Sequence, residues 1–194
     1  MALTPSTMLE LGTRAPNFRL PDVCARTEVE LDSVTKDASA TLILFICNHC
    51  PYVILLKPFF ADLARTYLAE GVVTIAISSN DAVKYPDDAP DKMAADVSQF
   101  GYSFPYLYDE DQSVAKAYRA ACTPDIFLFD RERKLVYRGQ FDDARPGNGR
   151  PVTGLDLKNA IKSVRTQKPV DPDQKPATGC NIKWKPGNAP DYFA

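Results

Sequence analysis

The sequence predicts an α/β protein in which helices flank a central mixed β-sheet. The apolar run Thr41–Ile46 has high β propensity and is typical of a strand buried on both faces. Apolar residues at helical spacing follow it, and Val72–Ser78 indicates a second buried strand. Strand, helix and strand with tight connections form a βαβ unit, which implies parallel pairing and a right-handed crossover. The length of 194 residues fits one domain with additions.

A short N-terminal β-hairpin is expected ahead of this unit, because residues 17–20 and 28–31 both alternate apolar and polar side chains. The helix of the unit carries its apolar residues from Tyr52 to Tyr67 and ends near Gly71. Pro58 lies inside this helix and should kink it.

The second half of the chain predicts an inserted helix and strand, then a hairpin and a last helix. The expected segments are a helix over 91–99 with Asp91 as N-cap, a strand over 106–108, a helix over 113–119, strands over 125–129 and 134–138, and a helix over 153–165. Residues 167–194 are rich in proline and predict an extended tail packed on the same domain. The expected division is therefore a domain of residues 1–166 and a tail of residues 167–194.

The charge balance argues against two classes of partner. The chain has 23 basic and 25 acidic residues, interspersed, so no field of one sign is available to gather nucleic acid or an anionic membrane. The apolar run at 42–46 is too short to span a bilayer. Residues 1–16 lack a basic region followed by an apolar one, so the expected location is the cytoplasm.

The motif Cys47-Asn48-His49-Cys50 stands where the buried strand ends and the helix begins. Free N–H groups and the positive end of a helix both favour a thiolate, and a thiolate is the nucleophile of disulfide exchange. Cys50 lies one turn after Cys47, within reach for a disulfide, and Pro51 fits the first helical turn. The competing interpretations are two inert packed thiols and a zinc site, although zinc usually needs four ligands and no second Cys pair or His pair follows.

His49 is the only histidine of the chain. As a cation beside Cys47 it would lower the pKa of that thiol; the alternative is an exposed loop residue. A stabilised Cys47 thiolate predicts a pair more oxidising than thioredoxin, between about −270 and about −120 mV. We also expect Cys47 to be the more exposed sulfur and Cys50 the buried one.

The order of these elements resembles the thioredoxin superfamily: a βαβ unit with Cys-X-X-Cys, the dipeptide Thr123-Pro124 before a hairpin, and a last helix. The resemblance implies that the bond before Pro124 is cis, that its loop lies against the cysteine pair, and that the Thr123 backbone pairs with substrate. An ordinary trans proline at a strand start is the alternative.

A narrower resemblance covers roughly residue 11 to the C-terminus. It rests on three segments, Cys47–Val53, Ala121–Asp125 and Gly179–Trp184, which together are similar to a bacterial thioredoxin-like or peroxiredoxin-like group (AhpC/TSA, redoxin). The stretch Ala15–Asp22 resembles the opening of the broader branch that contains peroxiredoxins and TlpA-like reductases. The chain departs from thioredoxins by having Ile46 in place of Trp before the first Cys and no acid in the preceding strand. It departs from peroxiredoxins because Cys47 takes the Thr position, and Ile43 the Pro position, of their Pro-X-X-X-Thr-X-X-Cys motif.

The other three cysteines have less certain roles. Cys122 adjoins the loop of Pro124 and is either an auxiliary thiol or a small packed residue. Cys180 lies in the tail and is either a resolving thiol or a packed or surface thiol. Cys24, in the hairpin turn, is expected to be incidental.

The sequence therefore predicts a thiol–disulfide oxidoreductase without cofactor or metal. Cys47 attacks a protein or small-molecule disulfide, Cys50 resolves the mixed disulfide, and a thiol supplies electrons. The alternative is an antioxidant thiol-dependent peroxidase on the same scaffold, resolved by Cys180 or a partner thiol. A third hypothesis is a metal-binding or redox-sensing module that uses Cys47, Cys50 and Cys122.

Overall fold

A computed structural model describes residues 3–193. Its centre is a five-stranded mixed sheet of order β6-β5-β4-β8-β9. Strands β4 (Ala40–Phe45), β5 (Val72–Ser78) and β6 (Tyr106–Tyr108) run parallel, while β8 (Asp125–Asp130) and β9 (Leu135–Tyr137) add antiparallel pairs. The predicted α/β fold with a central mixed sheet is confirmed.

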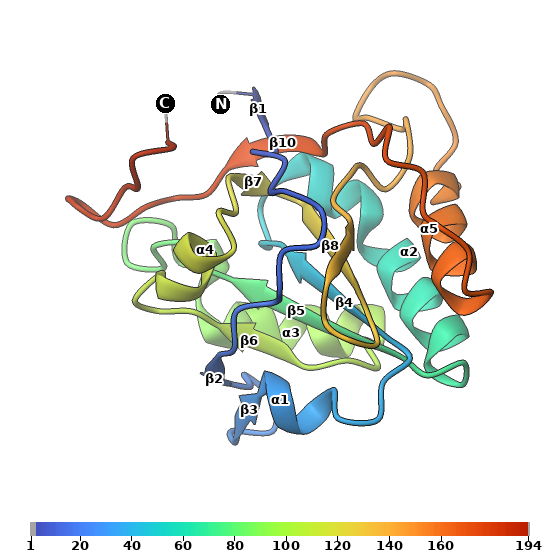
Figure 1. The fold of residues 1–194 in the computed structure, drawn as a ribbon. Helices are drawn as coiled ribbons and strands as arrows, with labels where there is room; N and C mark the ends of the chain where they lie inside the picture. The colour runs from blue at the N-terminus through green and yellow to red at the C-terminus, as the bar shows by residue number, and fades with distance from the viewer. Residues whose placement is uncertain (1–2, 194) are drawn as a thin grey trace.

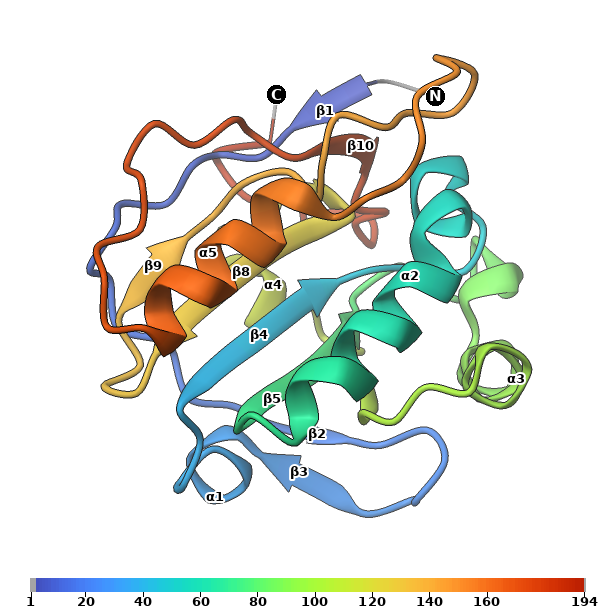
Figure 2. The same cartoon turned by 90° about the vertical axis from the view of Figure 1, so that its right-hand side faces the viewer.

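Helices cover both faces of this sheet (Figures 1 and 2). Helices α2 (Pro51–Leu68) and α5 (Leu155–Arg165) lie on one face, over the side chains of Leu42 and Leu44 in β4. The short helix α4 (Ser113–Ala117) packs on the opposite face, with Ile43 and Phe45. All six residues of β4 are buried, as the continuous apolar run predicts for a central strand.

The remaining elements are short and peripheral. Strands β2 (Arg19–Pro21) and β3 (Glu28–Glu30) form the predicted antiparallel hairpin and precede α1 (Leu31–Val34). The 3-10 helix η1 (Pro86–Asp88) and helix α3 (Pro90–Phe100) lie between β5 and β6. None of the helices in residues 3–193 combines the length and apolar character that crossing a bilayer requires.

One local prediction is wrong. Helix α3 begins one residue before Asp91, and its N-cap is Ala89, because Pro90 takes the first helical position, where no N–H is needed. Helix α2 continues through Pro58 as one element, and the kink expected at this proline stays a prediction.

A second, small sheet lies at the end of the molecule where both chain termini are found (Figure 1). It joins β1 (Leu3–Pro5), β10 (Thr178–Asn181) and β7 (Cys122–Thr123), with β10 in the middle and both pairings antiparallel. The sequence predicts only an extended tail here, and the division at residue 166 stays a prediction. The structure adds that part of this tail is a paired strand.

Candidate redox site

The cysteine motif lies in the turn between β4 and α2, at the carboxyl end of the central strand. Cys50 is the N-cap residue of α2 and Pro51 follows as its first residue, as the motif predicts. Both sulfur-bearing residues are buried: Cys47 is 1% exposed and Cys50 is 0% exposed. The prediction that Cys47 is the exposed sulfur is wrong, because the loop of Thr123 and the tail strand β10 cover this end of the sheet.

The Thr123–Pro124 peptide bond is cis, and its loop lies against the cysteine pair, so both of these predictions are confirmed. Cys47 Sγ lies 3.3 Å from Thr123 Oγ1, and Cys50 Sγ lies 3.1 Å from the Thr123 carbonyl oxygen. The Thr123 backbone is not free for a substrate, however. It pairs with Cys180 of β10 in the small antiparallel sheet.

Cys180 is the third thiol at this site. Its Sγ lies 2.9 Å from Cys50 Sγ, although the two residues are 130 positions apart in the chain. Cys122, by contrast, directs its sulfur towards the carbonyl oxygens of Pro124 and Ala177, at 3.5 and 4.0 Å. Cys24 is exposed in the turn of the β2–β3 hairpin, and none of the five cysteines is bridged.

Of the three thiols of this cluster, Cys50 is the one whose pKa is lowered. The pKa of Cys50 is lowered to about 5, and the largest cause is a hydrogen bond from the Cys47 thiol. Burial opposes this shift. Hydrogen bonds from the Cys180 thiol and from the backbone N–H groups of Cys180 and Val53 add to it. The same bond from Cys47 to Cys50, together with burial and the nearby charge of Asp88, raises the pKa of Cys47 well above its ordinary value. The prediction that His49 gives Cys47 the low pKa is therefore wrong.

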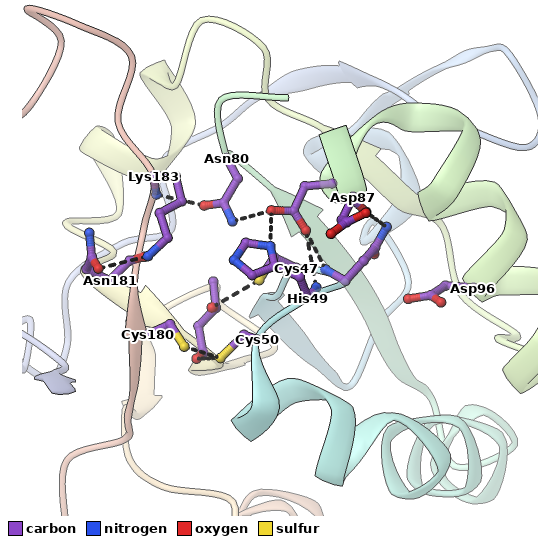
Figure 3. A network of polar contacts seen from close by, with 12 residues as sticks. Cys47, His49, Cys50, Asn80, Asp87, Asp96, Cys180, Asn181 and Lys183 are labelled. Carbon is purple, nitrogen blue, oxygen red and sulfur yellow. Dashed lines mark hydrogen bonds and ion pairs between the residues drawn. The ribbon is translucent and has the colours of Figure 1, made fainter. Parts of the chain in front are cut away.

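His49 is paired with Asp88, a residue of η1. The distance from His49 Nδ1 to Asp88 Oδ2 is 2.7 Å, and this hydrogen bond raises the pKa of His49 (Figure 3). Burial raises the pKa of Asp88, but hydrogen bonds from His49 and Asn80 lower it by more, so the pKa of Asp88 lies below its ordinary value. His49 thus forms a hydrogen-bonded pair with the Asp88 carboxylate beside Cys47.

Asp88 also fixes the backbone of the motif. Its Oδ1 accepts hydrogen bonds from the N–H groups of Asn48 at 2.8 Å and His49 at 3.4 Å. The Asn48 side chain donates to the Asp87 carbonyl oxygen and accepts from Tyr106. Asn80 donates to Asp88 Oδ2 at 2.8 Å, so the carboxylate is bonded at both oxygens. A fully buried acid with four donors is a rigid anchor for the motif.

Lys57 supports the same turn from helix α2. Its ammonium group donates to the Asn48 carbonyl oxygen at 3.0 Å and forms an ion pair with Asp96 of α3. Both partners are largely buried, with side-chain exposures of 7% and 13%. Lys57 therefore ties the motif to two helices.

Sequence reasoning missed the residues that tune the site: Asn80, Asp88 and Lys57. No spacing relates Asp88 to the cysteine motif 40 positions earlier, so the sequence alone does not bring this residue to the site. A signal was nevertheless present for Lys57. A lysine among the apolar positions of an amphipathic helix needs a buried partner, which points to an acid nearby.

One group in the described residues has the donor atoms of a metal site. A thiol, an imidazole nitrogen and a carboxylate oxygen, those of Cys47, His49 and Asp88, lie within 4.8 Å of one another. The set differs from the predicted one of Cys47, Cys50 and Cys122. Its histidine and carboxylate are already bonded to each other, so a metal would have to break that ion pair.

A reactive dithiol between a buried strand and a helix, beside the cis-proline loop, defines a thiol–disulfide oxidoreductase of the thioredoxin fold. The chain belongs to the redoxin family, since the profile of that family matches residues 10–153. The predictions of the fold, of the thioredoxin-like redoxin group and of a thiol–disulfide oxidoreductase are thus confirmed.

Known proteins resemble this chain at two levels. A hypothetical protein of Sinorhizobium meliloti is 51% identical, with a TM-score of 0.92, over 95% of this chain and all (100%) of that chain. The thiol-disulfide oxidoreductase ResA of Geobacillus thermodenitrificans is 27% identical over 68% of this chain and 70% of that protein. A Chlorobium tepidum structure described as the thiol:disulfide interchange protein DsbE shares the fold, with 22% identity, 81% and 99% coverage of the two chains, and a TM-score of 0.64.

Proposed function

We propose that Cys47 and Cys50 are the residues that carry out thiol–disulfide exchange in this protein. The observation that supports this most strongly is the arrangement of the sulfurs: Cys50 accepts a hydrogen bond from the Cys47 thiol, and its own pKa is lowered to about 5. The lowered pKa of Cys50 favours a thiolate within the pair near neutral pH, and a thiolate is the nucleophile of disulfide exchange.

The two sulfurs divide the reaction. Cys47 adjoins Asn48 and the partly exposed His49, so it is the sulfur next to the surface part of the motif. Cys47 passes its proton to the Cys50 sulfur and attacks one sulfur of the substrate disulfide as a thiolate, and the other substrate sulfur leaves as a thiolate. Cys50 then attacks Cys47 in the mixed disulfide, which closes the Cys47–Cys50 disulfide and releases the second substrate thiolate. A thiol donor returns the pair to the dithiol state.

Thr123, Pro124 and His49 position this pair. The Thr123 hydroxyl contacts Cys47 and the cis bond brings its carbonyl oxygen to Cys50. His49 forms a hydrogen bond with the Asp88 carboxylate, which lies beside Cys47. Substrates are protein or small-molecule disulfides, with no role for nucleic acid or a membrane, and the cytoplasm is the proposed location.

Trapping distinguishes the two cysteines. With insulin as disulfide substrate, Cys50→Ser should lose turnover and accumulate a mixed disulfide on Cys47, because the resolving sulfur is missing. Cys47→Ser should lose turnover without accumulating one, and Cys24→Ser should behave like the wild type. A mixed disulfide on Cys50 in the Cys47→Ser protein would reverse the roles. Faster consumption of hydrogen peroxide than of insulin would favour the antioxidant peroxidase.

A further inference from the structure

The tail strand β10 places a thiol against the redox pair. Cys180 is opposite Thr123 in the β7–β10 register, and its Sγ lies 2.9 Å from Cys50 Sγ (Figure 3). A disulfide bond is about 2.05 Å long, so the two sulfurs need to approach by less than about 1 Å to be bonded. Cys180 is only 4% exposed, so this thiol belongs to the interior of the site.

The fit of β10 against Thr123 depends on Gly179. A Cβ atom added at Gly179 would lie 2.0 Å from the Thr123 carbonyl oxygen, which no real side chain tolerates. The obstructing atom is backbone and belongs to the loop of the cis proline. Glycine at this position therefore lets β10 approach closely enough for the neighbouring Cys180 to reach Cys50.

Both sides of β10 are held in place. Leu3 of β1 pairs with Cys180 on the edge away from Thr123. Farther along the tail, the Lys183 N–H donates to Asn80 Oδ1 at 2.8 Å, and the Lys183 carbonyl oxygen accepts from the Asp81 N–H at 2.8 Å. Asn80 is the same residue that donates to Asp88, so the tail is bonded to the network of the motif. Cys180 is thus held in a fixed position against the redox pair by the pairing of β10 on both edges.

We propose that Cys180 is a third redox thiol, and that the disulfide of this protein moves between Cys47–Cys50 and Cys50–Cys180. This inference rests on the proposed function, which supplies the Cys47–Cys50 disulfide. The Cys180 thiol loses its proton and attacks Cys50 Sγ. The Cys50–Cys180 bond forms, the Cys47–Cys50 bond breaks, and Cys47 leaves as a thiolate that takes up a proton. The step is an exchange with no net oxidation, so no further oxidant is needed.

The geometry makes Cys50 the shared sulfur. Cys47 contacts Cys50 and the Thr123 hydroxyl, whereas Cys180 contacts Cys50 from the side of β10. Once Cys50 is bonded to Cys180, Cys47 is a thiol again and can attack a second substrate disulfide. The site then holds two disulfides on three cysteines, Cys50–Cys180 and the mixed disulfide of Cys47 with a substrate sulfur.

Peptide mapping of the oxidised full-length protein tests the proposal. Cleavage after Lys and Arg, except before Pro, leaves Cys47 and Cys50 together on residues 37–65 and Cys180 on residues 166–183. In the Cys47→Ser protein treated with diamide, a thiol oxidant, these two peptides should be joined by a disulfide. In Cys50→Ser they should not be joined, because Cys47 does not face Cys180. Cys122→Ser serves as the matched control and should leave the joined peptide of the Cys47→Ser protein unchanged.

A second variant tests the position of strand β10 without removing any thiol. Gly179→Ala, made in the Cys47→Ser protein, removes no thiol but forces β10 away from Thr123, so the yield of the joined peptide should fall several-fold. The proposal is overturned if a folded Cys47→Ser protein, checked by circular dichroism, gives no joined peptide while the wild type still closes Cys47–Cys50 and reduces insulin. Absence of both the Cys47–Cys50 disulfide and insulin turnover in the wild type would instead contradict the proposed function.

Discussion

Cys47 and Cys50 belong to one short motif and have opposite surroundings. Cys47 lies beside the buried Asp88 carboxylate, and its pKa is raised by its bond to Cys50, by burial and by that charge. Cys50 caps helix α2 and receives hydrogen bonds from two thiols and two backbone N–H groups. The Cys-X-X-Cys spacing sets how far apart the sulfurs are. The hydrogen bond between the two thiols is the largest cause of both pKa shifts. Two elements outside the motif add to them, because η1 brings the charge of Asp88 to Cys47 and β10 brings Cys180 to Cys50.

The largest effect should come from removing the thiolate. The pKa of Cys50 in the fold is about 5, below its ordinary 9.0, so its contribution to stability is complete above pH 9 and is lost as the pH falls to about 5. The reduced wild type should therefore unfold at lower urea concentration at pH 5 than at pH 8. Cys50→Ser should lose most of this difference, together with the thiolate absorbance near about 240 nm that titrates in this range. A titration unchanged by Cys50→Ser would assign the thiolate to another sulfur.

Replacing Asp88 tests the cause of the raised pKa of Cys47. Asp88→Asn removes the negative charge beside Cys47, so the pKa of Cys47 should fall. It also weakens the anchor of the motif, at a cost of about 2 kcal/mol in unfolding free energy, the scale of a hydrogen bond to a charged group. Alkylation rates against pH in the Cys50→Ser background measure the first effect, and urea unfolding measures the second. Asp87→Asn is the control, because the exposed Asp87 contacts the motif only through its carbonyl oxygen.

A smaller effect is expected at His49. The pKa of His49 is raised by Asp88, so its contribution to stability is complete below the ordinary 6.5 and is lost as the pH rises through the raised value. His49→Ala leaves the Asp88 charge unbalanced and should raise the pKa of Cys47 further. His49→Lys keeps a cation beside Asp88 and should bring the pKa of Cys47 part of the way back to its wild-type value. Equal Cys47 reactivity in His49→Ala and the wild type would leave His49 without influence on the pair.

The smallest effect should come from Cys122. Burial raises the pKa of this thiol well above its ordinary value, and its sulfur faces carbonyl oxygens. Cys122→Ala should cost about 1 kcal/mol through a small cavity and leave the insulin turnover unchanged. Urea unfolding and the insulin assay check both statements. A marked loss of turnover in a stable protein would place Cys122 in the redox reaction after all.

The sequence predicts the scaffold well because periodicity reports burial directly. The run of β4, the helical spacing of α2 and the hairpin at β2 and β3 all reappear in the structure. The position of the dithiol could also be predicted, since a motif between a strand and a helix has one place in a βαβ unit.

The electrostatics of the site could not be predicted in the same way. The Asp88 contacts join positions 40 apart and the Cys180 contact joins positions 130 apart, and no local pattern encodes such pairs. A strand of four residues such as β10 is also invisible to periodicity, because Thr178–Asn181 contains glycine and asparagine rather than alternating apolar residues. Its pairing depends on the edge that β7 offers.

The place of β10 near the end of the chain has a consequence for biosynthesis. Chains emerge from the ribosome N-terminus first, at about 5–20 residues per second. Cys47 and Cys50 are therefore synthesised well before Cys180, which lies 130 residues after Cys50. During that interval the nascent chain carries the reactive motif without the strand that covers it. The site of the folded protein is closed by a segment made well after the motif, so its sulfurs are more open to oxidants and chaperone thiols before β10 has been synthesised.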